Sequence, residues 1–118
     1  MLIIRKEQIE ALGKYMLKNY IERSLATVEA RFPEQTSHMD RSELREMIHG
    51  CIQKAKQFQI NMETDVGQFL KYNIIYGIDF YEKPEFTQAM DILNEDIDGT
   101  AKMILLSEYM DNIEKEIT

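Results

Sequence analysis

This chain is poor in the residues that cross-link a protein or interrupt its helices. Among 118 residues it has one cysteine, two prolines, five glycines and no tryptophan. The single cysteine, Cys51, excludes an intramolecular disulfide and any zinc site built from several cysteines. It lies among apolar residues of an expected helix, which favours a buried, unreactive thiol over a reactive one. The scarcity of proline and glycine is typical of a helical protein.

Long apolar runs are also missing. No stretch approaches the roughly 20 apolar residues that a transmembrane helix needs. The segment Met1–Lys6 is too short in its apolar part for the core of a signal peptide, and its charges follow that part. We therefore expect a cytoplasmic protein with no membrane partner. With 44% hydrophobic and 30% charged residues, we expect one domain over residues 1–118 with a single modest core.

Positive charge is scarce in the last third of the chain. The formal net charge is −7; residues 79–118 hold eleven acids and three bases, whereas residues 1–78 hold ten acids and eleven bases. An acidic segment repels the phosphates of nucleic acids, so no nucleic-acid partner is expected. It can attract a protein with a basic surface, although acidic side chains also serve solubility alone.

Apolar residues recur at three- or four-residue spacing through most of the chain, which predicts helices. A first long helix is expected over about residues 5–31, ending before Pro33 because the residue preceding a proline disfavours the helical conformation. Residues 33–39 are expected to form a linker. A second helix should begin with a capping box, in which Asp40 accepts a hydrogen bond from the N–H of Glu43, and end near residue 58.

Three further helices complete the expected fold, which is an all-α, single-domain orthogonal bundle of about five helices. Leu2–Ile4 is the one weak strand-like segment. Residues central on the apolar stripes are expected to be nearly buried, namely Phe32, Ile52, Phe69 and Met103. The first of the three helices is expected over about residues 62–76, with a cap at Asn61 or Thr64 and a left-handed Gly77 at its end. The second is short and has Pro84 in its first turn. The third runs from Gly99 or Thr100 to about Lys115.

The segment Asn94–Gly99 matches the first half of an EF-hand calcium loop, with oxygen-bearing side chains at loop positions 1, 3 and 5 and a glycine at position 6. The second half fails, because Lys102 stands at position 9 and Leu105 replaces the bidentate glutamate at position 12. An Asp-Gly turn before a helix explains the same residues. His38 and His49 also lack metal-ligand spacing, so no metal, cofactor or catalytic set is expected.

Aromatic residues concentrate in one segment. Tyr72, Tyr76, Phe80, Tyr81 and Phe86 lie within fifteen residues of one another. Phe80 and Phe86 are expected to anchor the loop that carries them, whereas Tyr72 and Tyr76 are one helical turn apart and can share an exposed face. Tyrosine is enriched at protein interfaces, so two interpretations stay open, core packing and a protein interface.

The interface interpretation combines these aromatics with neighbouring acids that would steer a basic partner. It predicts a protein-binding surface made of Tyr72, Tyr76, Asp79, Phe80, Tyr81, Phe86, Asp91, Glu95 and Asp98.

The alternative is a small enzyme whose site is assembled from scattered residues, namely His49, Tyr76, Asp79 and Glu82. An enzyme should show a concave site with perturbed carboxylates or histidine, whereas a binding protein should show a flatter apolar patch with an acidic border. The sequence leaves the oligomeric state open.

Short motifs follow one another along nearly the whole chain: Ile4-Arg5-Lys6-Glu7-Gln8, Arg31-Phe32-Pro33-Glu34, Ala55 with Phe58-x-Ile60, Thr64-Asp65-Val66 with Phe69, Gly77-Ile78-Asp79-Phe80, and Pro84. Their order resembles a family of small helical bacterial proteins encoded beside toxin and spike genes of contractile, type VI-like secretion loci. The resemblance implies an accessory role, as an adaptor, chaperone or immunity partner of a secreted effector, and supplies no catalytic residues. Where such relatives usually have a glycine in the turn before Ile60, this chain has Gln59.

Overall fold

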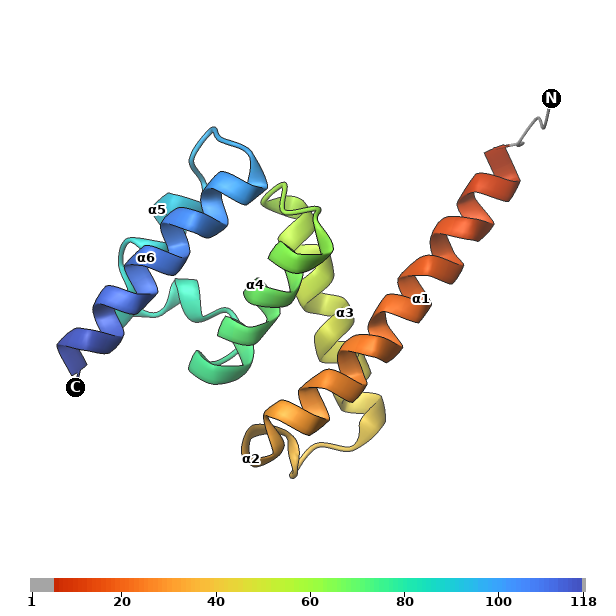
Figure 1. Cartoon of the computed structure of the whole chain (residues 1–118), viewed down its shortest axis with the longest axis horizontal. Coiled ribbons are helices and arrows are strands. Elements are labelled where there is room, and N and C mark those ends of the chain that lie inside the picture. Colours follow the sequence, from red (N-terminus) through yellow and green to blue (C-terminus); the bar gives the residue numbers. More distant parts are fainter. Residues whose placement is uncertain (1–5, 118) are drawn as a thin grey trace. The chain divides into compact units, whose positions relative to one another are not determined.

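The computed structural model describes residues 6–117, and every regular element in that range is helical (Figure 1). No strand occurs there, so the predicted all-α fold is confirmed; Leu2–Ile4 lies outside the described residues. None of these helices combines the length and the apolar character that crossing a bilayer requires. The elements are α1 (Lys6–Arg31), α2 (Pro33–Thr36), α3 (Arg41–Gln57), α4 (Glu63–Tyr76), the 3-10 helices η1 (Phe80–Glu82) and η2 (Pro84–Phe86), α5 (Ala89–Leu93) and α6 (Gly99–Ile117).

Contacts divide the chain into two compact units, and the boundary lies inside α3. Unit 1 comprises Met1–His49 and unit 2 comprises Gly50–Thr118. Helix α3 therefore contributes its first half to one unit and its second half to the other.

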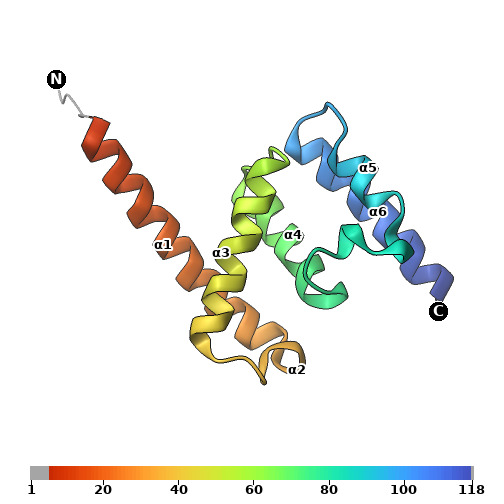
Figure 2. The ribbon, with the colours of Figure 1, turned by 180° about the vertical axis from the view of Figure 1, so that it is seen from behind.

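In unit 1, the last turns of α1 pack against the start of α3. Leu25 and Val28 of α1 are buried, as are Leu44 and Ile48 of α3. The N-terminal half of α1 extends away from α2 and from the first turns of α3 in both views (Figures 1 and 2). The expected linker over residues 33–39 instead contains α2.

In unit 2, α5 and α6 lie side by side (Figure 2), and α4 packs against α6 and η1. Phe69 and Met103 are buried as predicted. The burial predicted for Phe32 and Ile52 is wrong, because both are only half-buried. Phe32 leaves the helical conformation at the junction of α1 and α2. Ile52 lies at the edge of the buried stripe of α3, which is formed by Leu44, Ile48, Cys51 and Ala55.

Of the helix ends predicted from single residues, the N-cap of α3 is confirmed, whereas the predictions for the two ends of α4 are wrong. The N–H of Glu43 donates to Oδ1 of Asp40 at 2.8 Å, which confirms the predicted N-cap of α3. The caps predicted for α4 at Asn61 or Thr64 are wrong, because Met62 precedes the helix without a side-chain cap. Gly77 ends α4 with a φ of 105° and a ψ of 152°, which is not the left-handed helical conformation that was expected.

The end of α3 shows what Gln59 does in place of glycine. Its φ is 66°, the left-handed region, and the N–H of Ile60 donates to the carbonyl of Ala55 while the N–H of Gln59 donates to that of Lys56. These two bonds form a Schellman motif, the turn in which glycine is usual. The turn keeps its geometry without the glycine.

The short helix expected after Pro84 is broken into smaller pieces. Pro84 begins η2, which is three residues long, and α5 begins only at Ala89. Phe86, Ala89 and Leu93 are nevertheless buried, so the apolar positions face inward although the helix is not continuous.

Candidate functional site

The aromatic segment of unit 2 is mainly core. Phe80 is 0% exposed and its ring contacts those of Phe86, Tyr72 and Phe69, with centroids 5.8, 5.9 and 6.4 Å away. Tyr72, Tyr81 and Phe86 are also buried. Core packing is therefore the correct interpretation for Phe80, Tyr81, Phe86 and Tyr72.

Tyr72 and Tyr76 do not share an exposed face, because Tyr72 is buried. The Tyr72 hydroxyl lies 3.1 Å from Oγ of Ser107 on α6, and the Gln68 amide donates to the same Oγ at 2.9 Å. Helix α6 covers this side of α4, whereas Tyr76, one turn further along, stays half-exposed.

A chain of hydrogen bonds fixes the loop that follows α4. The Asn73 amide donates to the carbonyl of Phe69 at 2.9 Å, and its oxygen accepts from the N–H of Asp79 at 2.9 Å. The Tyr81 hydroxyl then donates to Oδ1 of Asp79 at 3.0 Å. Burial, followed by this hydrogen bond and the charge of Asp79, raises the pKa of Tyr81. Asp79, predicted as a binding residue, therefore holds the loop in place.

Three apolar side chains remain accessible at the end of α4. Ile75 and Ile78 are 39% and 50% exposed, and Tyr76 between them is half-buried. Burial raises the pKa of Tyr76, and the negative charges of Glu114 and Asp111 act in the same direction. Neither isoleucine is among the residues predicted for the binding surface, although neither lies on the buried stripe of Val66, Phe69 and Asn73.

Acidic residues follow these side chains in the loop after α4. Glu82 and Glu85 are exposed, and Lys83 between them donates to the carbonyl of Tyr76 at 2.7 Å, which ties the loop to the helix end. We call the set of Ile75, Tyr76, Ile78, Glu82 and Glu85 the α4-end patch.

The three other predicted acids differ in their roles. Asp91 and Glu95 are exposed and belong to no ion pair that the structure shows. Asp98 is exposed too, but its Oδ1 accepts the N–H of Ala101 at 2.8 Å and so caps the start of α6. The Asp-Gly turn before a helix is thus confirmed. Among the side chains that the structure describes, those of residues 13–115, no three from histidine, cysteine, aspartate or glutamate come together as metal ligands would.

The residues of the enzyme alternative divide between the two units. His49 is exposed at the end of unit 1. In unit 2, Glu82 is exposed, Tyr76 is half-buried and the Asp79 carboxylate is engaged by Tyr81.

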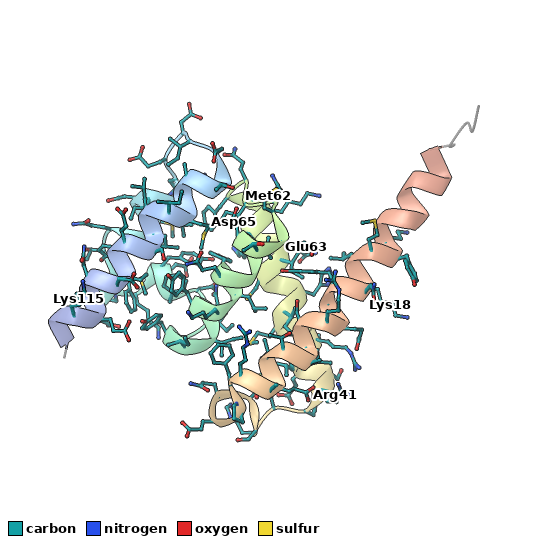
Figure 3. The ribbon with its side chains drawn as sticks, in the orientation of Figure 1. Lys18, Arg41, Met62, Glu63, Asp65 and Lys115 are labelled. Carbon is teal, nitrogen blue, oxygen red and sulfur yellow. The ribbon has the colours of Figure 1, made fainter. Side chains whose placement is uncertain are left out.

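Unit 1 has a groove of about 350 Å³ between α1 and the first half of α3. Leu17 and Ile21 provide its apolar floor and remain half-exposed. Figure 3 shows Lys18 on α1 and Arg41 at the start of α3. The remaining lining residues are charged or titratable, namely Lys14, Lys18, Glu22, Arg45, Glu46 and His49.

An ion pair joins the two helices that line this groove. The Arg45 guanidinium donates to both carboxylate oxygens of Glu22, at 2.7 and 3.3 Å. This hydrogen bonding lowers the pKa of Glu22 and raises that of Arg45. A second pair joins Arg41 to Glu29 at 3.1 Å. Glu22 and Arg45 neutralise each other, which leaves Lys14, Lys18 and Glu46 to set the charge of the rim.

No protein-family model, no curated protein and no solved structure matches this chain.

Proposed function

We propose that the protein is a non-catalytic protein-binding accessory of a bacterial secreted effector module, acting as an adaptor, chaperone or immunity partner. The bacterial setting rests on the resemblance of the sequence motifs. The binding role rests on one observation, the α4-end patch, where apolar side chains are exposed on a packed base and exposed acids follow in the adjoining loop.

The base of the patch supports binding because it is ordered before a partner arrives. Phe80 packs beneath it, and the Asn73 amide and the Lys83 ammonium hold the loop to α4. A surface that is already ordered loses less conformational entropy on association. Grouped, exposed apolar residues with a polar rim are typical of a docking surface.

The acidic charge of unit 2 supports a partner with a basic surface. Residues 50–118 hold thirteen acids against six bases, a net charge of −7. Glu82 and Glu85 carry part of this charge in the loop after α4, and the charges of Glu114 and Asp111 act on Tyr76. We therefore expect the partner to present an apolar cavity surrounded by lysine or arginine, and the acidic rim to accelerate its association.

The test uses proteins encoded beside this gene, purified and titrated by calorimetry against the full chain. Ile78→Asp should weaken binding by at least about tenfold, because it puts a charge into the apolar centre of the interface. Met62→Asp is the matched control, since Met62 is 65% exposed but lies at the other end of α4. Equal affinities for the two variants would show that the α4-end patch is not the interface.

A further inference from the structure

The groove of unit 1 and the outer face of α6 carry apolar and charged residues that complement one another. We propose that the groove of unit 1 receives helix α6 of a second copy of the protein. The proposed self-association uses none of the residues that define the α4-end patch, and it goes beyond the function proposed for that patch; Asp111 of α6 lies near enough to Tyr76 for its charge to act on the tyrosine.

The receiving surface is one face of α1. Lys14, Leu17, Lys18 and Ile21 follow one another at spacings that put them on the same side of a helix, and all four line the groove. Helix α3 covers Leu17 and Ile21 only in part. The aliphatic stems of the two lysines extend this apolar floor while their ammonium groups reach water.

The complementary surface is the outer face of α6. Met103, Leu106 and Met110 are buried in unit 2, so the opposite side of the helix faces outward. Ile104 is 57% exposed there. Glu108 and Asp111, four and seven residues further on, are exposed as well. One side of α6 therefore presents an apolar residue followed by two acids.

The two faces match when the helices run antiparallel. On α1, reading from Ile21 toward the N-terminus, the next residues on this face are Lys18 and Lys14. On α6, reading from Ile104 toward the C-terminus, the next residues on the outer face are Glu108 and Asp111. Both runs span seven residues, or about 10 Å of helix. In this register Ile104 packs on Ile21, Glu108 meets Lys18, and Asp111 meets Lys14.

Charge favours a second copy of the chain as the occupant. Unit 1 holds eight acids and eight bases and is neutral overall, whereas unit 2 carries −7. Among the described residues that line the groove, Glu22 is neutralised by Arg45, whereas Glu46 on the α3 side opposes an acidic helix. In the register above, both incoming acids meet lysines of α1.

The contact joins two different surfaces, so each copy can both offer a helix and receive one. A single pair of helices buries little area, so association should be weak and sensitive to salt.

The test is sedimentation velocity of the full chain from about 5 µM to about 500 µM, the range in which such small interfaces associate. We expect association that increases with concentration and weakens from about 0.05 M to about 0.5 M salt. Lys18→Glu and Glu108→Lys should each weaken it by about tenfold. The double variant, or an equimolar mixture of the two single variants, should restore it to within about threefold of the original chain.

Matched controls carry the same charge changes elsewhere. Lys71→Glu and Glu95→Lys alter exposed residues outside both surfaces and should associate like the original chain. Circular dichroism and thermal melting confirm that each variant is folded. A chain that stays monomeric throughout, single variants that behave like the controls, or a failure of the double variant to recover would each overturn the proposal. Binding of another molecule in the groove of a monomeric chain would assign the groove to that molecule instead.

Discussion

The ammonium group of Lys102, on α6, donates a hydrogen bond to the carbonyl oxygen of Phe58 at 2.8 Å. Phe58 follows the last residue of α3, where carbonyl groups lack partners within the helix. The amide oxygen of Gln59 also lies 3.4 Å from the ammonium. Lys102 is only 3% exposed, so a buried cation stands at the negative end of a helix dipole. Lys102, which stands where the calcium-loop pattern requires an oxygen ligand, thus joins α6 to the end of α3.

Replacing Lys102 by methionine should lower the free energy of unfolding by about 1.5–3 kcal/mol, the range for a hydrogen bond to a charged group. Methionine keeps most of the apolar stem but leaves the Phe58 carbonyl without its donor. Lys71→Met is the matched control, because Lys71 is exposed, and it should change stability by less than about 0.5 kcal/mol. Urea denaturation of both variants measures the difference; a loss for Lys102→Met as small as that of the control would show that the hydrogen bond adds nothing.

Two glycines should respond in opposite directions to substitution by alanine. A Cβ added to Gly99 would collide with the carbonyl oxygen of Gln59 and lie 2.7 Å from Cα of Ile60. Backbone atoms cannot move aside easily, so Gly99→Ala should destabilise the protein by about 1–3 kcal/mol or more. Gly50 lies inside α3 with nothing within 4 Å of such a Cβ.

Gly50→Ala should therefore stabilise the protein by up to about 1 kcal/mol, because alanine favours the helix and has a smaller backbone entropy to lose. Thermal melting of the two variants side by side provides the measurement. Destabilisation by both would mean that the surroundings of Gly50 are tighter than the structure shows.

Phe69 and Ile52 were expected to be equally buried, and the structure separates them. Phe69 is 0% exposed and its ring contacts Phe58, Phe80 and Tyr81. Phe69→Ala should cost about 3–5 kcal/mol. Ile52 is half-buried, so Ile52→Ala should cost clearly less, about 1–2 kcal/mol by the apolar area involved. Chemical denaturation that gave similar losses for both would contradict this assignment of the core.

Periodicity and local capping predicted the long helices well. The bounds of α1, α3 and α6 follow from apolar spacing, from Pro33 and from the carboxylate of Asp40, all of which act within a few residues. The same local signals do not predict the burial of a residue that is covered by a segment distant in sequence. Tyr72 is covered because Ser107 and the rest of α6 pack on that side of α4, 35 residues away in sequence.

The candidate surfaces were harder to predict for the same reason. Dense aromatics indicated an interface, but the rings of Phe80, Tyr81 and Phe86 pack on one another instead, and the exposed apolar residues are Ile75 and Ile78. Helical spacing shows which residues share a face, yet it does not show which faces the rest of the chain covers.

The buried thiol gives a prediction for pH. Burial, with a smaller effect of the Asp79 charge, raises the pKa of Cys51 from its ordinary value of 9.0 to about 12. In the unfolded chain the thiol loses its proton above about pH 9, whereas in the folded protein it keeps that proton until about pH 12. The unfolded state therefore binds fewer protons in this window, and the free energy of unfolding should fall as the pH rises. The full effect of one such group is about 1.4 kcal/mol per pH unit.

Cys51→Ala removes this group, so the stability of the variant should fall less steeply than that of the original chain between pH 9 and 11. Urea denaturation at several pH values gives the two slopes. The native thiol should also react with a disulfide reagent at neutral pH only as fast as the protein unfolds, because the thiolate is the reactive form. Parallel slopes for the two proteins, together with rapid modification of the native thiol, would show that Cys51 is more accessible than its 5% exposure implies.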